Sequence, residues 1–272
     1  MAESAAGADD LTGVGVAVTR AGAGPGRLGE LLRDRGAMVV HWPCIRFDPP
    51  ADPTPLAAAV ERAASFDWLV VTSPRAARRW LDAWAAERGS VAQPPVPAAA
   101  AGSATAAVLR EAGWPVQRLG DEYSARGLIE AFEAAGDAGG ARILFPCSNL
   151  ASDEAPEGLR RLGAEVERIV AYRTVPTPPD PDEVHRAIEA GTVRVATFTS
   201  PSTVEGFLDG TDDVTMKLVR HRLAAAAIGA TTAGALEAAG WPAVVAHVAS
   251  LEGLVDAAAR AALGSDVRKG TT

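Results

Sequence analysis

The sequence predicts an α/β protein built from two similar domains, each with a parallel sheet covered by helices. Short runs of Val, Ile, Leu and Ala alternate with amphipathic stretches of helical length, which is typical of such sheets. The chain also repeats itself at an offset of 127 residues, since Thr72-Ser73-Pro74 returns as Thr199-Ser200-Pro201. This duplication predicts two domains and, between them, a cleft that holds one extended ligand from both sides.

The repeat is clearest between residues 98 and 115, where 11 of 18 positions match their counterparts. The matches include Gly113-Trp114-Pro115, which returns as Gly240-Trp241-Pro242. The period is far longer than that of solenoid repeats, which excludes that class of protein. A length of 272 residues suits two domains that each have a core of their own.

Ten strands and ten helices are expected in alternation. Continuous apolar runs are typical of parallel strands buried on both faces. The runs cover residues 14–19, 37–41, 67–71, 96–101, 115–119, 142–146, 165–170, 193–198, 223–228 and 243–248. The helices between them are expected to begin near Arg27, Thr54, Pro74, Ser103, Ser124, Ala155, Asp182, Pro201, Thr231 and Leu251.

Two proline-rich stretches, residues 42–55 and 171–181, are predicted to be linkers. Proline disfavours both the interior of a helix and a central strand. The two stretches occupy equivalent places in the two repeats, so each is expected to play the same part in its half of the chain.

The linkers are expected to cross between the domains. One domain then takes residues 44–172, and the other combines residues 1–43 with 173–272, so that each has five strands. The alternative is two sequential domains divided near residue 140. The crossing arrangement is preferred because only Gly136–Gly140 offers a break there.

The composition argues against several classes of protein. A net charge of −8 disfavours a nucleic-acid-binding surface, which needs concentrated Lys and Arg. The two cysteines, Cys44 and Cys147, suit a reducing cytosol better than a disulfide framework. Four scattered histidines give no zinc-site spacing, so no metal is expected.

No membrane partner is expected, because no apolar run approaches the ~20 residues of a membrane span. The opening residues, MAESAAGADD, lack the basic and apolar regions of a signal peptide. This leader and the tail after Leu263 are expected to be unstructured. The protein is expected to be a cytoplasmic monomer.

Four turns that each join a strand to a helix carry hydroxyl or glycine residues, at the strand ends where open parallel sheets bind ligands. Their candidate substrate-binding residues are Thr72, Ser73, Gly102, Ser103, Thr105, Ser200, Ser202, Gly229, Thr231 and Thr232. Helix starts of this kind direct N–H groups at anions such as carboxylates. The alternative is that each Ser or Thr only caps its helix. Because the turns form matched pairs, ligand binding is favoured for the set.

Two further candidate binding residues follow strands. Arg20 ends the first strand and is either an anion clamp, which is favoured, or a surface charge. Ser148 follows the strand 142–146, beside Cys147, which has no histidine near it and is expected to be packed and unreactive. Gly22–Gly26 suggests a dinucleotide loop, but its GxGxG spacing and a second strand without a terminal acid argue against one.

Tyr172 is one of only two tyrosines and lies where the predicted domains meet. It is either an aromatic that packs at the hinge with its hydroxyl hydrogen-bonded, or a positioned acid or hydrogen-bond donor.

Residues 226–233, followed by Leu236 and Gly240, resemble the uroporphyrinogen-III synthase family. Other segments of the chain resemble the same family in the same order between residues 14 and 262. These segments are 69–75, 102–106, 144–147 with Asn149, 172–175 and 200–202. The ordered set is far more specific than any one of these short motifs.

The resemblance implies two flavodoxin-like domains joined by a two-stranded crossing linker. It also implies that the chain closes the linear tetrapyrrole hydroxymethylbilane into uroporphyrinogen III, with inversion of the last ring, loss of water and no metal or organic cofactor. Tyr172 matches the family's cleft tyrosine and is therefore the candidate for assisting departure of hydroxide. The chain departs from the family pattern at two positions. Position 103 is Ser, and position 230 is Ala where the family often has proline.

Two other interpretations stay open at this point. One is a catalytically silent relative that binds a tetrapyrrole or another polyanion in the cleft between the domains. The other is an unrelated two-domain protein that binds a sugar or a nucleotide. A shared fold cannot distinguish the first of these from an enzyme.

Overall fold

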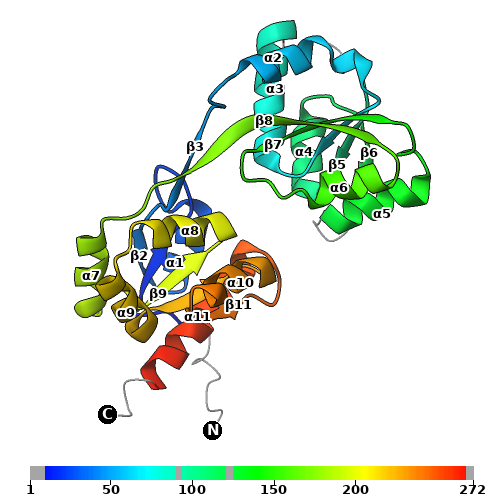
Figure 1. The fold of residues 1–272 in the computed structure, drawn as a ribbon. Coiled ribbons are helices and arrows are strands. Elements are labelled where there is room, and N and C mark those ends of the chain that lie inside the picture. Colours follow the sequence, from blue (N-terminus) through cyan, green and yellow to red (C-terminus); the bar gives the residue numbers. More distant parts are fainter. Residues whose placement is uncertain (1–9, 90–93, 121–124, 268–272) are drawn as a thin grey trace. The chain divides into compact units, whose positions relative to one another are not determined.

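The computed structural model describes residues 10–89, 94–120 and 125–267 (Figure 1). The contacts within the chain divide it into two compact units. Unit 1 takes Met1–Phe47 with Val175–Thr272, and unit 2 takes Asp48–Thr174. The divisions fall inside two strands, β3 (Ile45–Asp48) and β8 (Glu165–Pro176). The boundaries predicted from the sequence, after residues 43 and 172, lie a few residues earlier.

Unit 1 contains a five-stranded sheet in the order β11-β10-β9-β1-β2. Each pair of neighbouring strands in this sheet is parallel. The strands are β1 (Gly15–Val18), β2 (Met38–His41), β9 (Val195–Phe198), β10 (Ala224–Ala227) and β11 (Ala243–Val245). Numbered along this unit, the order is 2-1-3-4-5, which is the flavodoxin-like order.

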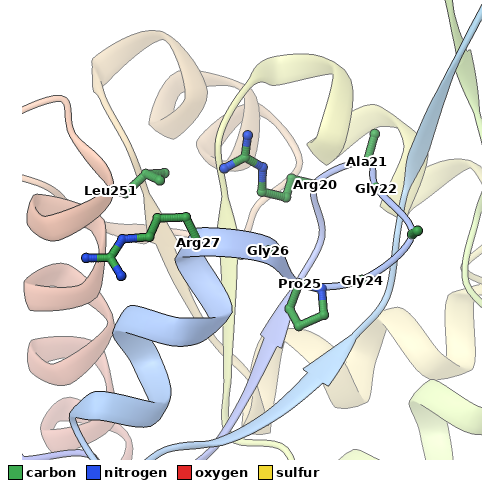
Figure 2. A pocket seen from close by; sticks show the side chains of 9 residues that line it. Arg20, Ala21, Gly22, Gly24, Pro25, Gly26, Arg27 and Leu251 are labelled. Atoms are coloured by element: carbon green, nitrogen blue, oxygen red, sulfur yellow. The ribbon is translucent and has the colours of Figure 1, made fainter.

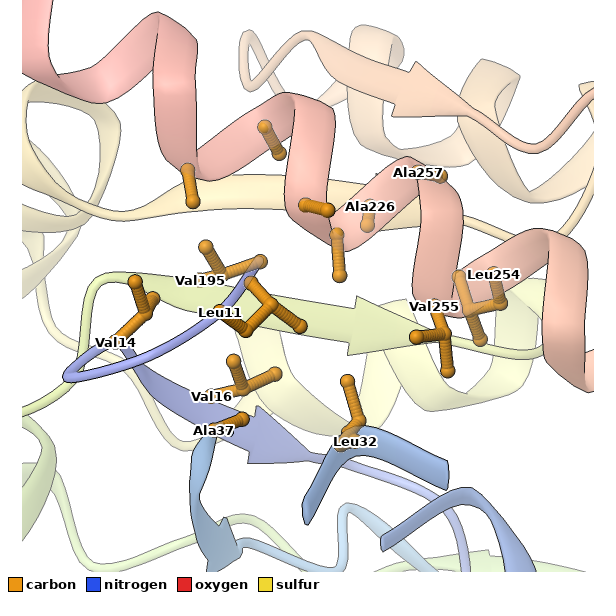
Figure 3. Packing of buried hydrophobic residues seen from close by; sticks show 14 of the residues in the cluster. Leu11, Val14, Val16, Leu32, Ala37, Val195, Ala226, Leu254, Val255 and Ala257 are labelled. Atoms are coloured by element: carbon orange, nitrogen blue, oxygen red, sulfur yellow. The ribbon is translucent and has the colours of Figure 1, made fainter. Parts of the chain in front are cut away.

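Helices cover both faces of the sheet in unit 1. Successive strand residues point to opposite sides, so the apolar strands present side chains that must be buried on each face. Val16 and Val195 pack with α1 and α11 on one face (Figure 3), whereas Ala17, Ala196 and Phe198 pack on the other. The second face is covered by α7, α8, α9 and α10. The helices are α1 (Gly26–Asp34), α7 (Pro181–Glu189), α8 (Pro201–Asp209), α9 (Asp213–Arg222), α10 (Ala230–Ala238) and α11 (Leu251–Val267).

Unit 2 contains a six-stranded sheet in the order β3-β8-β7-β4-β5-β6. The pairs from β8 to β6 are all parallel. The remaining strands are β4 (Trp68–Val71), β5 (Ala98–Ala100), β6 (Val116–Leu119) and β7 (Arg142–Ser148).

The sheet of unit 2 is also covered on both faces. On one face Trp68, Ile143 and Phe145 pack with Leu128 and Phe132 of α5 and with Leu159 of α6. On the other, Trp80 and Trp84 of α3 stack edge-on against Trp114. The helices of this unit are α2 (Thr54–Glu61), α3 (Pro74–Arg88), α4 (Ser103–Glu111), α5 (Ala125–Ala135) and α6 (Glu154–Arg161), with a short 3-10 turn at Ala63–Ser65.

The duplication seen in the sequence recurs in the hydrogen bonds. Trp114 donates its Nε1 hydrogen to the carbonyl of Val96, and Trp241 donates to the carbonyl of Leu223, both at 2.9 Å. Both residues of the second pair lie 127 positions after those of the first. These buried bonds hold the backbone just before β5 in unit 2 and just before β10 in unit 1, so the same local packing occurs in both units.

The repeats and the folding units are not the same segments. Strands β7, β8, β4, β5 and β6 of unit 2 correspond, at the repeat offset, to β1, β2, β9, β10 and β11 of unit 1. Each unit therefore combines the first two strands of one repeat with the last three strands of the other. In Figure 1 the sheet of unit 1 accordingly mixes blue strands from the start of the chain with yellow and orange strands from its end.

The predicted α/β class with parallel sheets is confirmed, and the ten expected strands are all present. One strand and one α-helix were missed within the described residues, besides the 3-10 turn at Ala63–Ser65. β3 lies inside the stretch 42–55 that was predicted to be a linker, and α9 lies between two expected elements. The stretch 171–181 is also not a simple linker, because β8 continues through Pro176.

The predicted unstructured tail after Leu263 is wrong as far as Val267, because α11 continues to that residue. The predicted leader, apart from its last residue, lies outside the described residues, as does the predicted helix start at Ser124. None of the helices that the structure describes combines the length and apolar character needed to cross a membrane.

Replacing Gly206 in α8 by alanine is expected to lower the melting temperature. A Cβ atom at this position would overlap the carbonyl oxygen of Cys44, so the backbone would have to move. Overpacking of this kind costs about 1–3 kcal/mol.

Gly234 in α10 provides the matched control, because a Cβ atom there would meet no atom of the described structure within 4 Å. Gly234→Ala is expected to stabilise the protein by about 0.4–1 kcal/mol. Thermal unfolding followed by circular dichroism measures both variants. A Gly206→Ala protein that melts no earlier than its parent would contradict the close approach of α8 to Cys44.

Candidate functional site

The predicted binding residues gather at the carboxyl edge of each sheet. Parallel neighbours end at the same edge, so the turns that follow them lie side by side. In unit 1 the turns after β1, β9 and β10 contribute Arg20, Ser200, Ser202, Gly229, Thr231 and Thr232. In unit 2 the ends of β4, β5 and β7 with the segments that follow them, and the later part of β8, contribute Thr72, Ser73, Gly102, Ser103, Thr105, Ser148 and Tyr172.

The serines of the two Ser-Pro turns cap the helices that they precede. Ser73 Oγ accepts a hydrogen bond from the Ala76 N–H at 3.1 Å. Ser200 Oγ accepts one from the Thr203 N–H at 3.3 Å, and Thr203 returns the contact in a capping box. Ser202 Oγ lies 2.9 Å from Ser200 Oγ. Ser73 and Ser200 therefore cap their helices, as the alternative interpretation predicts, which does not prevent the turns from also contacting a ligand.

The two glycine turns are built differently. Gly102 and Gly229 stand at the N-caps of α4 and α10, and within the described residues no side chain caps either helix there. Thr105 and Thr232, each the third residue of its helix, have side chains only 3% exposed and pack inward. At these two helix starts the available donors are therefore backbone N–H groups, which lie at the positive end of the helix dipole.

A hollow of about 550 Å³ opens at the carboxyl edge of unit 1, over the loop between β1 and α1 (Figure 2). Two arginines, Arg20 and Arg27, stand at the ends of this loop, and Leu251 joins them from the start of α11. Residues 21–26 line the remainder. The Gly22–Gly26 segment, which does not match a dinucleotide fingerprint, therefore lines a pocket that also has two arginine side chains.

The two arginines differ in how they are held. The Arg27 guanidinium lies 3.2 Å from the Glu30 carboxylate one turn further along α1, and both side chains are largely exposed. The Arg20 backbone carbonyl lies 3.1 Å from Nε2 of His41 at the end of β2, which fixes the loop where it leaves the sheet. An anion in this pocket would meet the first turn of α1 and both guanidinium groups.

Tyr172 lies on β8 opposite Ser148, the last residue of β7. Its side chain is 8% exposed. Ser148 is equally buried, and its hydroxyl lies 3.1 Å from Oγ1 of Thr174. The structure thus places two predicted residues side by side, with the Ser148 hydroxyl engaged inside the protein.

Cys147 is buried, as predicted. Burial raises the pKa of its thiol, although the Arg168 guanidinium, whose Nε lies 3.1 Å from Sγ, acts in the opposite direction. A thiol with a raised pKa holds little of the reactive thiolate at neutral pH. Among the described residues, no group of three or more His, Cys, Asp or Glu side chains could hold a metal ion.

Three residues that belong to these edges were not among the predicted binding residues, although Asn149 was part of the family resemblance. Arg27 and Leu251 line the pocket of unit 1, and Asn149 follows β7 in unit 2. Arg27 could have been found, since a cation after a glycine-rich turn is a recognisable signal. The position of Leu251 depends on a contact between segments that are distant in the chain. The contacts of Asn149 depend on the irregular register between β7 and β8.

Comparisons with known proteins converge on one family. A family model described as uroporphyrinogen-III synthase HemD matches residues 26–256 of this chain. The uroporphyrinogen-III synthase of Synechococcus elongatus is 30% identical over 198 residues, covering 72% of this chain and 74% of that protein. The chloroplastic uroporphyrinogen-III synthase of Oryza sativa subsp. japonica is also 30% identical, over 81% of this chain and 71% of that protein.

The fold has a counterpart among solved structures. A mutant uroporphyrinogen III synthase from the extremely thermophilic bacterium Thermus thermophilus superposes with a TM-score of 0.62. At 20% sequence identity, over 95% of this chain and all of the other, that likeness concerns the fold alone. The family match and the two relatives carry the assignment: this chain belongs to the uroporphyrinogen-III synthase family.

Proposed function

We propose that this chain is a uroporphyrinogen-III synthase, a carbon–oxygen lyase that cyclises hydroxymethylbilane to uroporphyrinogen III with inversion of ring D and loss of water. The observation that carries the proposal is the family match, which extends over residues 26–256. The hydroxylated and glycine-rich turns at the carboxyl edge of each sheet support it, because open parallel sheets bind ligands at that edge.

The substrate is a long, flexible molecule with eight carboxylates, and the edges suit such a polyanion. In unit 1 the pocket offers Arg20 and Arg27 together with the start of α1. Arginine binds carboxylates through paired N–H donors, and helix starts add N–H groups without further side chains. The proposal assigns substrate contacts to turns of both units, as the duplicated motifs lead us to expect.

The chemical step needs orientation more than acid strength. Loss of the terminal hydroxyl from an electron-rich pyrrole leaves an electrophilic azafulvene that reacts readily, so the enzyme must fold the tetrapyrrole until the substituted carbon of ring D attacks it. Holding the reacting groups in position can supply most of the acceleration in such a reaction. Tyr172 is the proposed donor to the departing hydroxyl, and a single donor contributes on the order of 10²–10⁴-fold.

The proposal extends to a monomer in the cytoplasm. Both cysteines are buried and unpaired in the structure, which suits a reducing compartment.

Incubation with freshly generated hydroxymethylbilane tests the function. Because the substrate also cyclises without an enzyme to the uninverted isomer, the identity of the product is a better readout than the rate. Chromatography of the oxidised products should show mainly the type III isomer. If only uroporphyrinogen I appears, the chain is a catalytically silent relative.

Tyr172→Phe is expected to fold normally and to yield a larger share of uroporphyrinogen I. The substitution removes only the phenolic hydroxyl, and kcat for the type III product is expected to fall on the order of 10²–10⁴-fold. Isomer analysis and the melting temperature are measured together. An unchanged isomer ratio would show that Tyr172 only packs.

Arg20→Gln is expected to raise KM for hydroxymethylbilane about 10-fold, because one charge-assisted hydrogen bond to a carboxylate is lost. The melting temperature should stay that of the parent. Arg33→Gln is the matched control, since Arg33 lies at the end of α1, is exposed and does not line the pocket. Equal increases in KM for the two variants would indicate a general effect of net charge.

A further inference from the structure

An irregularity in strand pairing sets the direction of Tyr172. β7 and β8 pair in regular register up to Cys147 and Val170, but the next pair is Ser148 with Tyr172. Ala171 is therefore an extra residue on β8, which makes this a β-bulge. A bulge turns the residues after it relative to those before it, and such bulges recur beside active sites.

The burial of β8 shows this change of direction. Val170 is 37% exposed, whereas Ala171 and Tyr172 are 1% and 8% exposed. In a regular strand, neighbouring residues point to opposite faces. If these residues alternated regularly, with no bulge, Tyr172 would share the face of the exposed Val170.

Asn149 binds the backbone of β8 at Tyr172 itself and at Thr174, two residues further along the strand. Its N–H donates to the carbonyl of Tyr172 at 3.2 Å. Its side-chain Oδ1 accepts from the N–H of Thr174 at 2.7 Å, and its Nδ2 donates to the carbonyl of Thr174 at 3.4 Å. The amide side chain thus pairs with Thr174 as a backbone peptide group would, and continues the ladder past the bulge.

The turn that carries Asn149 is itself fixed to the same strand. Arg168 of β8 donates to the carbonyl of Ala151 at 2.7 Å and pairs with Asp153 at 2.6 Å. Ser148 Oγ accepts from the N–H of Leu150 and lies 3.1 Å from Oγ1 of Thr174. With both of its ends attached, the turn can hold Asn149 in one place.

The duplication supplies an internal comparison. At the repeat offset, Gly22 of unit 1 stands where unit 2 has Asn149, and Ile45 stands where unit 2 has Tyr172. Glycine has no amide side chain, and β1 and β2 still pair in regular parallel register over Gly15–Val18, ahead of this position. The sheet therefore forms without an asparagine at this position, and the clamp occurs in the unit that has the tyrosine.

We propose that Asn149 is a positioning residue for Tyr172: its amide fixes the backbone around the bulge and thereby the direction of the phenol. The inference rests on the proposed function, in which the hydroxyl of Tyr172 takes part in the reaction. Asn149 touches the substrate at no point in this scheme and acts only through the tyrosine.

A double-mutant cycle tests the proposal. Asn149→Ala is expected to lower kcat for uroporphyrinogen III on the order of 10- to 100-fold, because a small displacement of a reacting group has effects of this size. KM should change little. In the Tyr172→Phe background the same substitution should have no further effect on kcat or on the isomer ratio.

Two variants control for loss of structure. Asn149→Asp keeps the acceptor for the Thr174 N–H and should recover part of the activity lost in Asn149→Ala. Asp67→Ala removes a comparable side-chain bond, to the Arg142 N–H at 2.8 Å, at the opposite end of β7. It should leave kcat and the isomer ratio as in the parent.

A measurement without substrate tests the geometry directly. The chain has two tyrosines, Tyr123 and Tyr172, so labelling with 3-fluorotyrosine gives two fluorine signals, one of which disappears in Tyr172→Phe. Asn149→Ala is expected to shift or broaden the Tyr172 signal in the folded protein, whereas Asp67→Ala should leave it unchanged.

The outcomes separate this inference from the proposed function. If Asn149→Ala lowers kcat equally in both backgrounds, or leaves the Tyr172 fluorine signal unmoved, the positioning role is overturned while the function stands. If Tyr172→Phe keeps the parent's isomer ratio, the role of the tyrosine falls and the positioning role falls with it. If the parent makes only uroporphyrinogen I, the proposed function itself fails.

Discussion

The parallel alignment of neighbouring strands is the constraint on which the rest of this molecule depends. Two parallel strands can be joined only by a connection that returns to the starting edge, so every strand in such a sheet ends on the same side. The turns that follow β1, β9 and β10 in unit 1, and β4, β5 and β7 in unit 2, are gathered by that rule alone. Residues far apart in the chain, such as Arg20 and Thr232, are thereby brought to one edge.

The two edges have come to differ although their scaffolds agree. The same strand order, the same buried indole bonds and the same pairs of turns are found in both units. After β1, however, unit 1 has an open loop with two arginines, whereas after the equivalent strand β7, unit 2 has a turn held by Asn149 and Arg168. Unit 1 thus has two arginines beside its pocket, and unit 2 has a turn held by several hydrogen bonds. Under the proposed function, the arginines suit a substrate with many carboxylates, and the fixed turn suits its one reacting centre.

Much of the fold could be predicted from the sequence, because apolar runs and helix starts are local signals. β3 was missed because its four residues lie between prolines, which argue against a strand unless it lies at a sheet edge. β3 is indeed the edge strand of its sheet. α9 was missed because it follows α8 closely and has no strand before it. At the site, the positions of the turns could be predicted, and so could capping as one role of Ser73, because a Ser before a helix start is a local pattern. Whether Asn149 reaches Thr174 depends on strand register, which no local pattern encodes.

The exchange of strands between the repeats has a consequence for how the polypeptide can be divided. A cut at the point of internal symmetry, before β7, would separate β1 and β2 from β9, β10 and β11, and would also separate β4, β5 and β6 from β7 and β8. Each fragment would then hold parts of two unfinished sheets, with unpaired strand edges and exposed apolar faces. Neither fragment would be an autonomous half, in spite of the evident symmetry. Mixed together, the two fragments could complete both sheets only by reassociating, as two copies of a shorter ancestral chain would have done by trading segments.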